Sequence, residues 1–255
     1  MHSLVTGASS GIGAAFARAL RRRGDKLILV ARRADRLETL ARELGGPDVV
    51  AVVPVDLTQA GAVEKIAKAV EAQGLVVDRL VNNAGVGHTG RFLEEPPERI
   101  LGMLDLNNRA AVALTRRFVP GMVARQRGTL IKVVSTAAFQ PVPYLAVYAA
   151  SKAFLLSFTE GLATELAGTG VRVQALCPGL TATEFQEVAG TDQVAFNKTG
   201  AMTPEAVVAA SLAGLDSGAL RVVPGFLNRA TLVAQRFLPQ ALVRKVGAKL
   251  FEPGH

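Results

Sequence analysis

The stretch Thr6-Gly7-Ala8-Ser9-Ser10-Gly11-Ile12-Gly13 stands between a short apolar segment at residues 4–5 and a segment with helical spacing at residues 12–23. Glycine suits a sharp turn because it adopts backbone conformations that other residues avoid. Gly7 is expected to make the turn, Gly11 to let a ligand approach the backbone, and Gly13 to let the helix pack closely on the sheet. A helix that begins here offers unpaired N–H groups to an anion such as a pyrophosphate. The stretch predicts a phosphate-binding turn, with an ordinary structural turn as the alternative.

Strand-like and helix-like segments alternate outward from this turn along almost the whole chain. The segments with strand character are residues 4–5, 26–31, 49–55, 78–82, 129–134, 171–176 and 220–223. Helical spacing is found at residues 12–23, 35–44, 62–73, 97–125, 148–167 and 204–215, and Pro120 is expected to kink or split the longest of these. This alternation predicts an α/β fold: one domain with a doubly wound parallel sheet of about seven strands and helices on both faces, a Rossmann-like arrangement. The carboxyl ends of the strands then share one edge, where ligands bind.

The composition fits one domain of this size. The chain has 255 residues, 49% of them hydrophobic, which is enough for a core that needs no metal or disulfide. Cys177 is the single cysteine, so an internal disulfide is excluded and a reducing compartment is expected. The sequence has no run of about 18 apolar residues and does not begin like a signal peptide, so a cytoplasmic location is expected.

The formal charge of +8 raises three classes of partner: nucleic acid, a membrane surface, or a small anionic ligand. Only 5% of the residues are aromatic, so few rings are free to stack on bases, and no nucleic-acid partner is expected. The tightest basic groups are Arg21-Arg22-Arg23 and Arg32-Arg33, and both flank the strand after the glycine turn. The charge therefore fits a small anionic ligand held near that turn.

Arg32-Arg33 directly follows the second predicted strand, and no acidic residue occurs before Asp35. An acidic side chain at this place would accept hydrogen bonds from a ribose 2′-hydroxyl and favour NAD, whereas arginine accommodates a 2′-phosphate. The guanidinium group matches phosphate oxygens in geometry and charge. The sequence predicts NADP(H) as the cofactor; the alternative is that both arginines are solvated charges at a helix entry.

Two further turns follow strands at the same expected edge. Asp56-Leu57 follows the third strand and is placed to meet an adenine ring. Asn82-Asn83-Ala84-Gly85 follows the fourth strand and is placed near the adenosine ribose. A purely structural turn is the alternative for the second, because asparagine tolerates turn geometry.

Tyr148 and Lys152 stand four residues apart at the start of a predicted helix and therefore share one face. A free tyrosine has a pKa of about 10, and a nearby ammonium lowers that pKa towards the range useful for general acid–base catalysis. Ser135, at the end of the fifth strand, is placed to hydrogen-bond a substrate oxygen. Asn107 interrupts an apolar helical stretch and could hold a helix irregularity and a water. A surface Tyr–Lys pair and an exposed polar helix face are the structural alternatives.

These motifs, taken together in order and spacing, resemble the short-chain dehydrogenase/reductase family from about Ser3 to Pro224. The resemblance implies that Tyr148 is the general acid or base, that Ser135 orients the carbonyl, and that Lys152 binds the nicotinamide ribose and lowers the pKa of the tyrosine. It also implies that Asn107 holds a water in a proton relay. The cofactor residues implied by motif and resemblance are Gly7, Ser9, Ser10, Gly11, Ile12, Gly13, Arg32, Arg33, Asp56, Leu57, Asn83, Ala84, Gly85, Tyr148, Lys152, Pro178, Gly179 and Thr183.

The resemblance also implies what is bound. The expected reaction interconverts a ketone or aldehyde and an alcohol with NADP(H), and the expected partner is a small, apolar carbonyl or alcohol substrate contacted by Ser135 and Tyr148. No metal is expected. His88, Phe139, Tyr144 and an apolar lid at residues 184–202 are candidates for the pocket wall. Two alternatives remain: a non-catalytic NADP(H)-binding regulatory protein, and a peripheral membrane-associated reductase that acts on a lipophilic substrate.

The C-terminus departs from many family members, which end in a glycine-rich segment soon after the seventh strand. Residues 1–225 are expected to form the dinucleotide-binding and catalytic domain, and residues 226–255 a helical extension of it that is basic, amphipathic and broken at Pro239. Packing on its own domain is the favoured interpretation of this extension. Contact with a membrane surface, a cover over the pocket and a dimer contact are the alternatives, so the expected homo-oligomer is a dimer or a tetramer.

Overall fold

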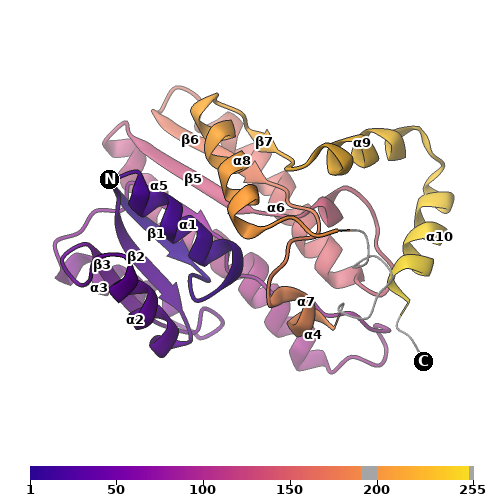
Figure 1. The fold of residues 1–255 in the computed structure, drawn as a ribbon, viewed down its shortest axis with the longest axis horizontal. Coiled ribbons are helices and arrows are strands. Elements are labelled where there is room, and N and C mark those ends of the chain that lie inside the picture. The colour runs from indigo at the N-terminus through magenta and orange to yellow at the C-terminus, as the bar shows by residue number, and fades with distance from the viewer. Residues whose placement is uncertain (191–199, 253–255) are drawn as a thin grey trace.

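The computed structural model describes residues 1–190 and 200–252 as seven parallel strands with helices on both faces of the sheet (Figure 1). The strand order is β3-β2-β1-β4-β5-β6-β7. The strands are β1 (His2–Thr6), β2 (Lys26–Ala31), β3 (Val50–Pro54), β4 (Arg79–Asn82), β5 (Gly128–Val133), β6 (Val171–Leu176) and β7 (Arg221–Val222). The helices are α1 (Gly11–Arg22), α2 (Ala34–Glu43), α3 (Ala62–Ala72), α4 (Pro97–Leu104), α5 (Ala110–Ala124), α6 (Ala146–Glu165), α7 (Phe185–Ala189), α8 (Pro204–Asp216), α9 (Phe226–Ala234) and α10 (Gln240–Phe251). The predicted doubly wound fold is confirmed.

The continuous apolar character of the strands follows from burial on both faces. Adjacent strand residues point to opposite sides of a sheet. Val5 accordingly packs with Phe16 of α1 in one core, while its neighbour Leu4 packs with Ile66 of α3 and Leu114 of α5 in the other. No strand position in the centre of the sheet can therefore be exposed, which explains why alternation with polar residues is absent there.

The strand order changes direction between β1 and β4. From β1 the chain continues to β2 and β3 on one side of β1, and the next strand, β4, pairs with the other side of β1. At such a point the connections after the two neighbouring strands diverge and leave a crevice at the carboxyl ends. The glycine turn after β1 and the Asn-rich turn after β4 both lie at this crevice.

One predicted helix differs from the structure. The segment predicted as residues 97–125 is α4, then a π-helical turn at Asp105–Arg109, then α5. Pro120 lies inside α5 without splitting it, so the predicted split is wrong and the kink stays a prediction. Pro120 and the residue four positions before it, Arg116, are both exposed, so water can satisfy the carbonyl that proline leaves without a donor. The helix is interrupted instead around Asn107.

The chain ends in two helices separated at Pro239, as the sequence predicted. A 3-10 turn at Gln235–Phe237 follows α9, and α10 then runs beside the substrate side of the domain (Figure 1, orange to yellow). Within the described ranges, the helices are too short or too polar to cross a membrane.

Lys132 of β5 is a fully buried lysine. Its Nζ donates a hydrogen bond to Thr115 Oγ1 at 2.7 Å and lies 4.8 Å from the centroid of the Phe158 ring. No carboxylate contacts it among the ion pairs of the described residues. Burial lowers the pKa of Lys132 to about 7, because the charged form is poorly solvated there.

We expect Lys132→Met to stabilise the protein and to remove part of its pH dependence. The folded protein releases the lysine proton near pH 7, whereas the unfolded chain holds it to about pH 10.4. Between these values the unfolded chain binds more protons, so stability rises with pH. The substitution should raise the unfolding free energy at pH 7 by about 1–4 kcal/mol, the range seen when buried ion pairs are replaced by apolar residues of similar volume. Denaturant titrations at several pH values measure the unfolding free energy of the variant, and Lys26→Met, at an exposed lysine, is the control. A Lys132→Met protein less stable than the wild type at pH 7 would contradict the prediction.

Candidate active site

The glycine turn is shaped by close contacts that leave no room for side chains. Gly7 and Gly11 have φ angles of 64° and 53°, which favour glycine. A Cβ atom on Gly13 would lie 2.2 Å from the carbonyl oxygen of Gly7. Ser10, which precedes α1, makes no side-chain capping hydrogen bond to the helix. The first turn of α1 therefore has N–H groups available for an anion, and the residues fit the pyrophosphate of a dinucleotide.

The Asn-rich turn after β4 holds this glycine turn in place. Asn83 Nδ2 donates to the carbonyl oxygens of Thr6 and Gly7, at 2.8 and 3.3 Å. The Thr6 hydroxyl accepts hydrogen bonds from the backbone N–H groups of Asn83 and Ala84, both at 3.0 Å. These contacts favour a structural role for the Asn83 side chain, the alternative left open by the sequence.

Arg33 lies over the glycine turn. Its guanidinium donates to Ser9 Oγ at 3.1 Å and to Ser10 Oγ at 3.0 Å. It also pairs at 3.0 Å with Glu184, a carboxylate that Arg36 contacts as well. These two arginines lower the pKa of Glu184, chiefly through their hydrogen bonds. Arg33, the arginine predicted to meet a 2′-phosphate, thus lies beside the glycine turn. The Glu184 carboxylate already pairs with part of its guanidinium group.

Arg32 and Asp56 line a second part of this edge, a cavity of about 410 Å³ that also includes Lys65. Burial tends to raise the pKa of Asp56, but hydrogen bonds from Thr58 and the charge of Arg32 outweigh it and the pKa is lowered. Leu57 instead packs into the core, with 7% of its surface exposed. The cavity therefore supports an adenine-side role for Asp56, while the side chain of Leu57 faces away from it.

Ser135, Tyr148 and Lys152 meet beyond the carboxyl end of β5. Tyr148 and Lys152 lie one turn apart on α6, and Lys152 Nζ is 5.7 Å from the centre of the tyrosine ring. Lys152 Nζ donates to the carbonyl oxygen of Val133, the last residue of β5, at 2.9 Å. The hydroxyl of Ser135 is hydrogen-bonded to that of Tyr148. Three side chains predicted separately from the sequence are thus in one place.

Burial controls the protonation of this group. It raises the pKa of Tyr148 to about 12, although the hydrogen bond with Ser135 acts in the opposite direction. Burial also lowers the pKa of Lys152 to about 8. Desolvation is the largest influence on the Tyr148 pKa and outweighs the hydrogen bond with Ser135. That Lys152 lowers the pKa of Tyr148 stays a prediction. Tyr148 is a phenol at neutral pH.

Asn107 lies in the π-helical turn and is buried. Its Oδ1 accepts from the N–H of Val86 at 2.9 Å, and its Nδ2 donates to the Val86 carbonyl at 2.9 Å and to Ser151 Oγ at 3.0 Å. A Cβ atom on Gly85 would lie 3.1 Å from Asn107 Oδ1 and 3.3 Å from Lys152 Nζ. Asn107 thus fixes the turn after β4 beside the Lys152 ammonium, and its role in holding a water stays a prediction.

The segment after β6 closes over the same edge. The carbonyl of Pro178 accepts from the N–H of Thr136, next to Ser135, at 2.8 Å. Thr183 faces Gly11, because a Cβ there would lie 3.0 Å from the Thr183 methyl group. A Cβ on Gly179 would lie 2.5 Å from Asn228 Oδ1 of α9. Sequence reasoning missed Asn228, since nothing in the local pattern places α9 against Gly179.

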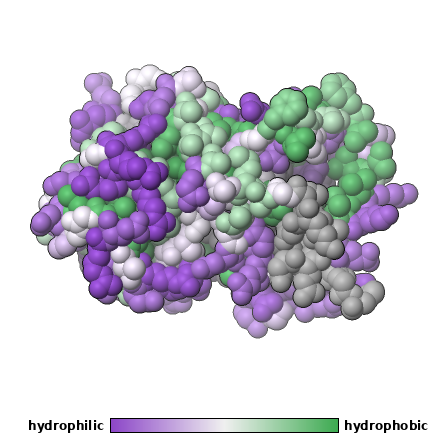
Figure 2. Space-filling view, viewed as in Figure 1, coloured by the Kyte–Doolittle hydropathy of each residue, from purple (hydrophilic) through white to green (hydrophobic). Residues whose placement is uncertain are grey.

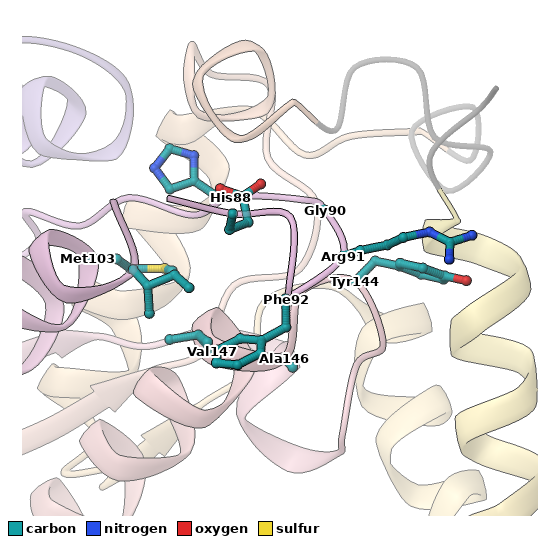
Figure 3. A pocket seen from close by; sticks show the side chains of 10 residues that line it. His88, Gly90, Arg91, Phe92, Met103, Tyr144, Ala146 and Val147 are labelled. Atoms are coloured by element: carbon teal, nitrogen blue, oxygen red, sulfur yellow. The ribbon is translucent and has the colours of Figure 1, made fainter. Parts of the chain in front are cut away.

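An apolar cavity of about 280 Å³ lies next to the group formed by Ser135, Tyr148 and Lys152 (Figure 3). His88 and Tyr144 line it as predicted, but Phe139 packs instead in a separate cluster under Arg221. Part of the predicted lid, residues 191–199, lies outside the described residues. The cavity residues are His88, Gly90, Arg91, Phe92, Glu95, Ile100, Met103, Tyr144, Ala146 and Val147.

Phe185 of α7 packs against the ring of Tyr148. Its ring centre lies 5.4 Å from that of Tyr148, with the planes tilted by 47°. Met103 and Val147, which line the cavity, belong to the same apolar cluster as Tyr148 and Phe185. The tyrosine is therefore surrounded on its substrate side by apolar groups.

Comparison with known proteins assigns the family. The short chain dehydrogenase family matches residues 2–194. The chain belongs to this family. Relatives include an uncharacterized oxidoreductase of Myxococcus xanthus, 42% identical over 72% of this chain and 73% of the relative. The NADP-dependent 3-hydroxy acid dehydrogenase YdfG of Escherichia coli is 37% identical over 80% of this chain and 84% of the relative.

Solved structures of short-chain dehydrogenases agree with the fold. A short-chain dehydrogenase from Sphingobium yanoikuyae in complex with NADPH superposes with a TM-score of 0.81 at 32% identity, over 94% of this chain and 97% of that one. A 7β-hydroxysteroid dehydrogenase superposes with a TM-score of 0.86 at 26% identity, over 97% and 96%. The family predicted from the sequence motifs is confirmed.

We expect Gly13→Ala to disrupt the glycine turn. The added methyl group would collide with the Gly7 carbonyl at 2.2 Å and with Asn83 Nδ2 at 2.6 Å. Because of this collision, the variant should have a lower melting temperature and should bind a dinucleotide at least tenfold more weakly. Gly161→Ala is the matched control, because Gly161 lies in α6 with open space around its Cβ position and alanine has the higher helix propensity. Thermal melts and fluorescence titration with NADPH measure both variants. Equal behaviour of the two would contradict the prediction.

Proposed function

We propose that this short-chain dehydrogenase is an NADP(H)-dependent oxidoreductase that interconverts a ketone or aldehyde and an alcohol, with Tyr148 as general acid or base. The observation that carries the proposal is the grouping of Ser135, Tyr148 and Lys152 beyond β5, on the sheet edge that also carries the glycine turn. The expected homo-oligomer and the cytoplasmic location stay predictions.

The protein groups at the sheet edge support NADP(H) as the cofactor. Gly7 to Gly13 and the start of α1 would hold the pyrophosphate, and Arg32 and Arg33 the 2′-phosphate. The NADPH in the solved Sphingobium relative and the NADP-dependence in the name of YdfG agree with this choice. The bound nicotinamide would supply or accept the hydride.

The chain's own residues would manage the proton. In reduction, the Tyr148 hydroxyl donates its proton to the carbonyl oxygen, and Ser135 Oγ holds that oxygen in place. The Lys152 ammonium stabilises the phenolate that remains. Because the pKa of Tyr148 is about 12, the tyrosine is protonated at neutral pH and is ready to act as the acid. Oxidation needs the phenolate and is therefore favoured at higher pH.

The substrate side supports a largely apolar carbonyl compound. Phe92, Met103 and Val147 form the apolar wall of the cavity, and Phe185 covers the tyrosine. Arg91 is the basic side chain of the cavity wall that carries a permanent charge. It supports a second candidate, a substrate with a carboxylate at the far end, which is the class in the name of YdfG. A screen of ketones, aldehydes and 3-hydroxy acids, followed by NADPH absorbance, tests both and also tests a purely regulatory NADP(H)-binding role.

We expect Tyr148→Phe to lower kcat for carbonyl reduction by about 10²–10⁴-fold, because it removes the proton donor. NADPH affinity should change by less than about threefold, since the ring itself is retained. Tyr144→Phe is the comparison, because the Tyr144 hydroxyl donates to Glu252 at 3.3 Å, away from Ser135 and Lys152. Steady-state kinetics and NADPH titration separate the two effects. A Tyr148→Phe protein as active as the wild type would refute the mechanism.

We expect substitutions around Arg33 to change NADPH affinity in opposite directions. Arg32→Ala with Arg33→Ala should weaken NADPH by at least tenfold and leave NADH nearly unchanged, because only NADPH carries the 2′-phosphate. Glu184→Gln should tighten NADPH by about two- to fivefold, because it removes an exposed ion-pair partner that competes for Arg33. Titration of each protein with both cofactors measures this. Equal losses for NADPH and NADH would contradict the assignment.

A further inference from the structure

The helix α9 presents its apolar side to solvent. Phe226, Val233 and Phe237 follow one another at helical spacing, and 57–83% of their surfaces are exposed. The partly buried side of the same segment carries Leu232 and the polar residues Asn228 and Gln235, and Asn228 Nδ2 donates to the Pro224 carbonyl at 2.7 Å. A helix packed on its own domain normally buries its apolar stripe. In α9 most of the large apolar residues face solvent instead.

The helix α10 continues this surface. Gly247 lies against Pro143, and Phe251 packs into the apolar cluster that contains Tyr148, so this side of α10 is held by the domain. The opposite side exposes Leu242 and Val246, at 46% and 51%. Figure 2 shows apolar atoms gathered over α9 and α10. We name as the tail surface the exposed apolar residues Phe226, Leu227, Val233, Phe237, Leu238, Leu242 and Val246.

Basic side chains accompany the tail surface. Between residues 226 and 252 the chain carries five basic residues and one acidic residue, Glu252, which accepts from the Tyr144 hydroxyl. The basic residues are exposed and lie on both helices: Arg229, Arg236, Arg244, Lys245 and Lys249. Exposed apolar residues bordered by lysine and arginine are the pattern of helices that lie in the interface of an anionic membrane.

We propose that the tail surface binds the surface of a membrane that contains anionic lipids. The charge decides between this partner and a second copy of the chain. A symmetric contact through the tail surface would place two sets of five basic residues against each other, which is unfavourable. Anionic headgroups neutralise the same residues, while the phenylalanine and leucine side chains enter the acyl boundary. The helices lie on the membrane and do not cross it.

This attachment would bring the candidate substrate cavity close to the lipid. Tyr144, which lines the cavity, reaches towards α10, as Figure 3 shows together with Arg91. Pro143, in the same loop, contacts Gly247. A lipophilic carbonyl compound dissolved in the membrane would then be near the cavity. This consequence rests on the proposed function, whereas the attachment itself does not.

The test is co-sedimentation of the full-length protein with vesicles of phosphatidylcholine, with and without phosphatidylglycerol. We expect binding to the anionic vesicles, at least about tenfold weaker binding to the neutral ones, and loss of binding at high salt. Phe226→Ser with Phe237→Ser should weaken binding at least about tenfold, and so should Arg236→Gln with Arg244→Gln. These residues are exposed, and circular dichroism checks that each variant is folded.

The controls remove apolar or basic side chains elsewhere on the surface. Val76→Ser with Leu93→Ser removes exposed apolar side chains, and Arg22→Gln with Arg116→Gln removes exposed charges; both should bind as the wild type does. No vesicle binding, or equal binding by all variants, overturns the proposal. If the phenylalanine variants change only the mass measured by light scattering, the tail surface is a contact between copies and the proposal is wrong. None of these measurements needs enzymatic activity, so failure here leaves the proposed function standing.

Discussion

The close approach of α1 to the ends of β1 and β4 is the constraint on which the candidate site depends. A methyl group at Gly13 would overlap the Gly7 carbonyl, and Asn83 ties the same turn to the strand beyond. This packing aims the start of α1 at the crevice where the strand order reverses. A dinucleotide held there as proposed would lie across the carboxyl ends of β1, β4 and β5, and therefore near Tyr148 and Lys152.

Burial then sets the chemistry of the catalytic group. The same exclusion of water raises the pKa of Tyr148 and lowers that of Lys152, so both neutral forms gain stability together. The apolar neighbours Phe185 and Met103 produce this exclusion and also form the substrate side. Under the proposed function, the protonation state of Tyr148 and the preference for an apolar substrate would share one physical cause, the low polarity of this end of the domain.

The glycine turn, the catalytic group and the C-terminal helices are joined by contacts between residues far apart in the chain. Glu184, after β6, meets Arg33, after β2, and Asn228 of α9 meets Gly179. The segment after β6 therefore lies between the cofactor side and the tail. A change on one side can reach the other through this segment, since it contacts both.

The sheet, the glycine turn and the family could be predicted from the sequence, because strand burial, turn geometry and motif spacing are local or periodic properties. The break at Pro239 could also be predicted, because proline disfavours a continuous helix. Three other features could not be predicted without the folded arrangement: Pro120 stays inside α5, Leu57 faces the core, and burial raises the pKa of Tyr148. Exposure and desolvation depend on neighbours from distant segments. For the same reason, the amphipathic tail was predictable but the side that faces solvent was not.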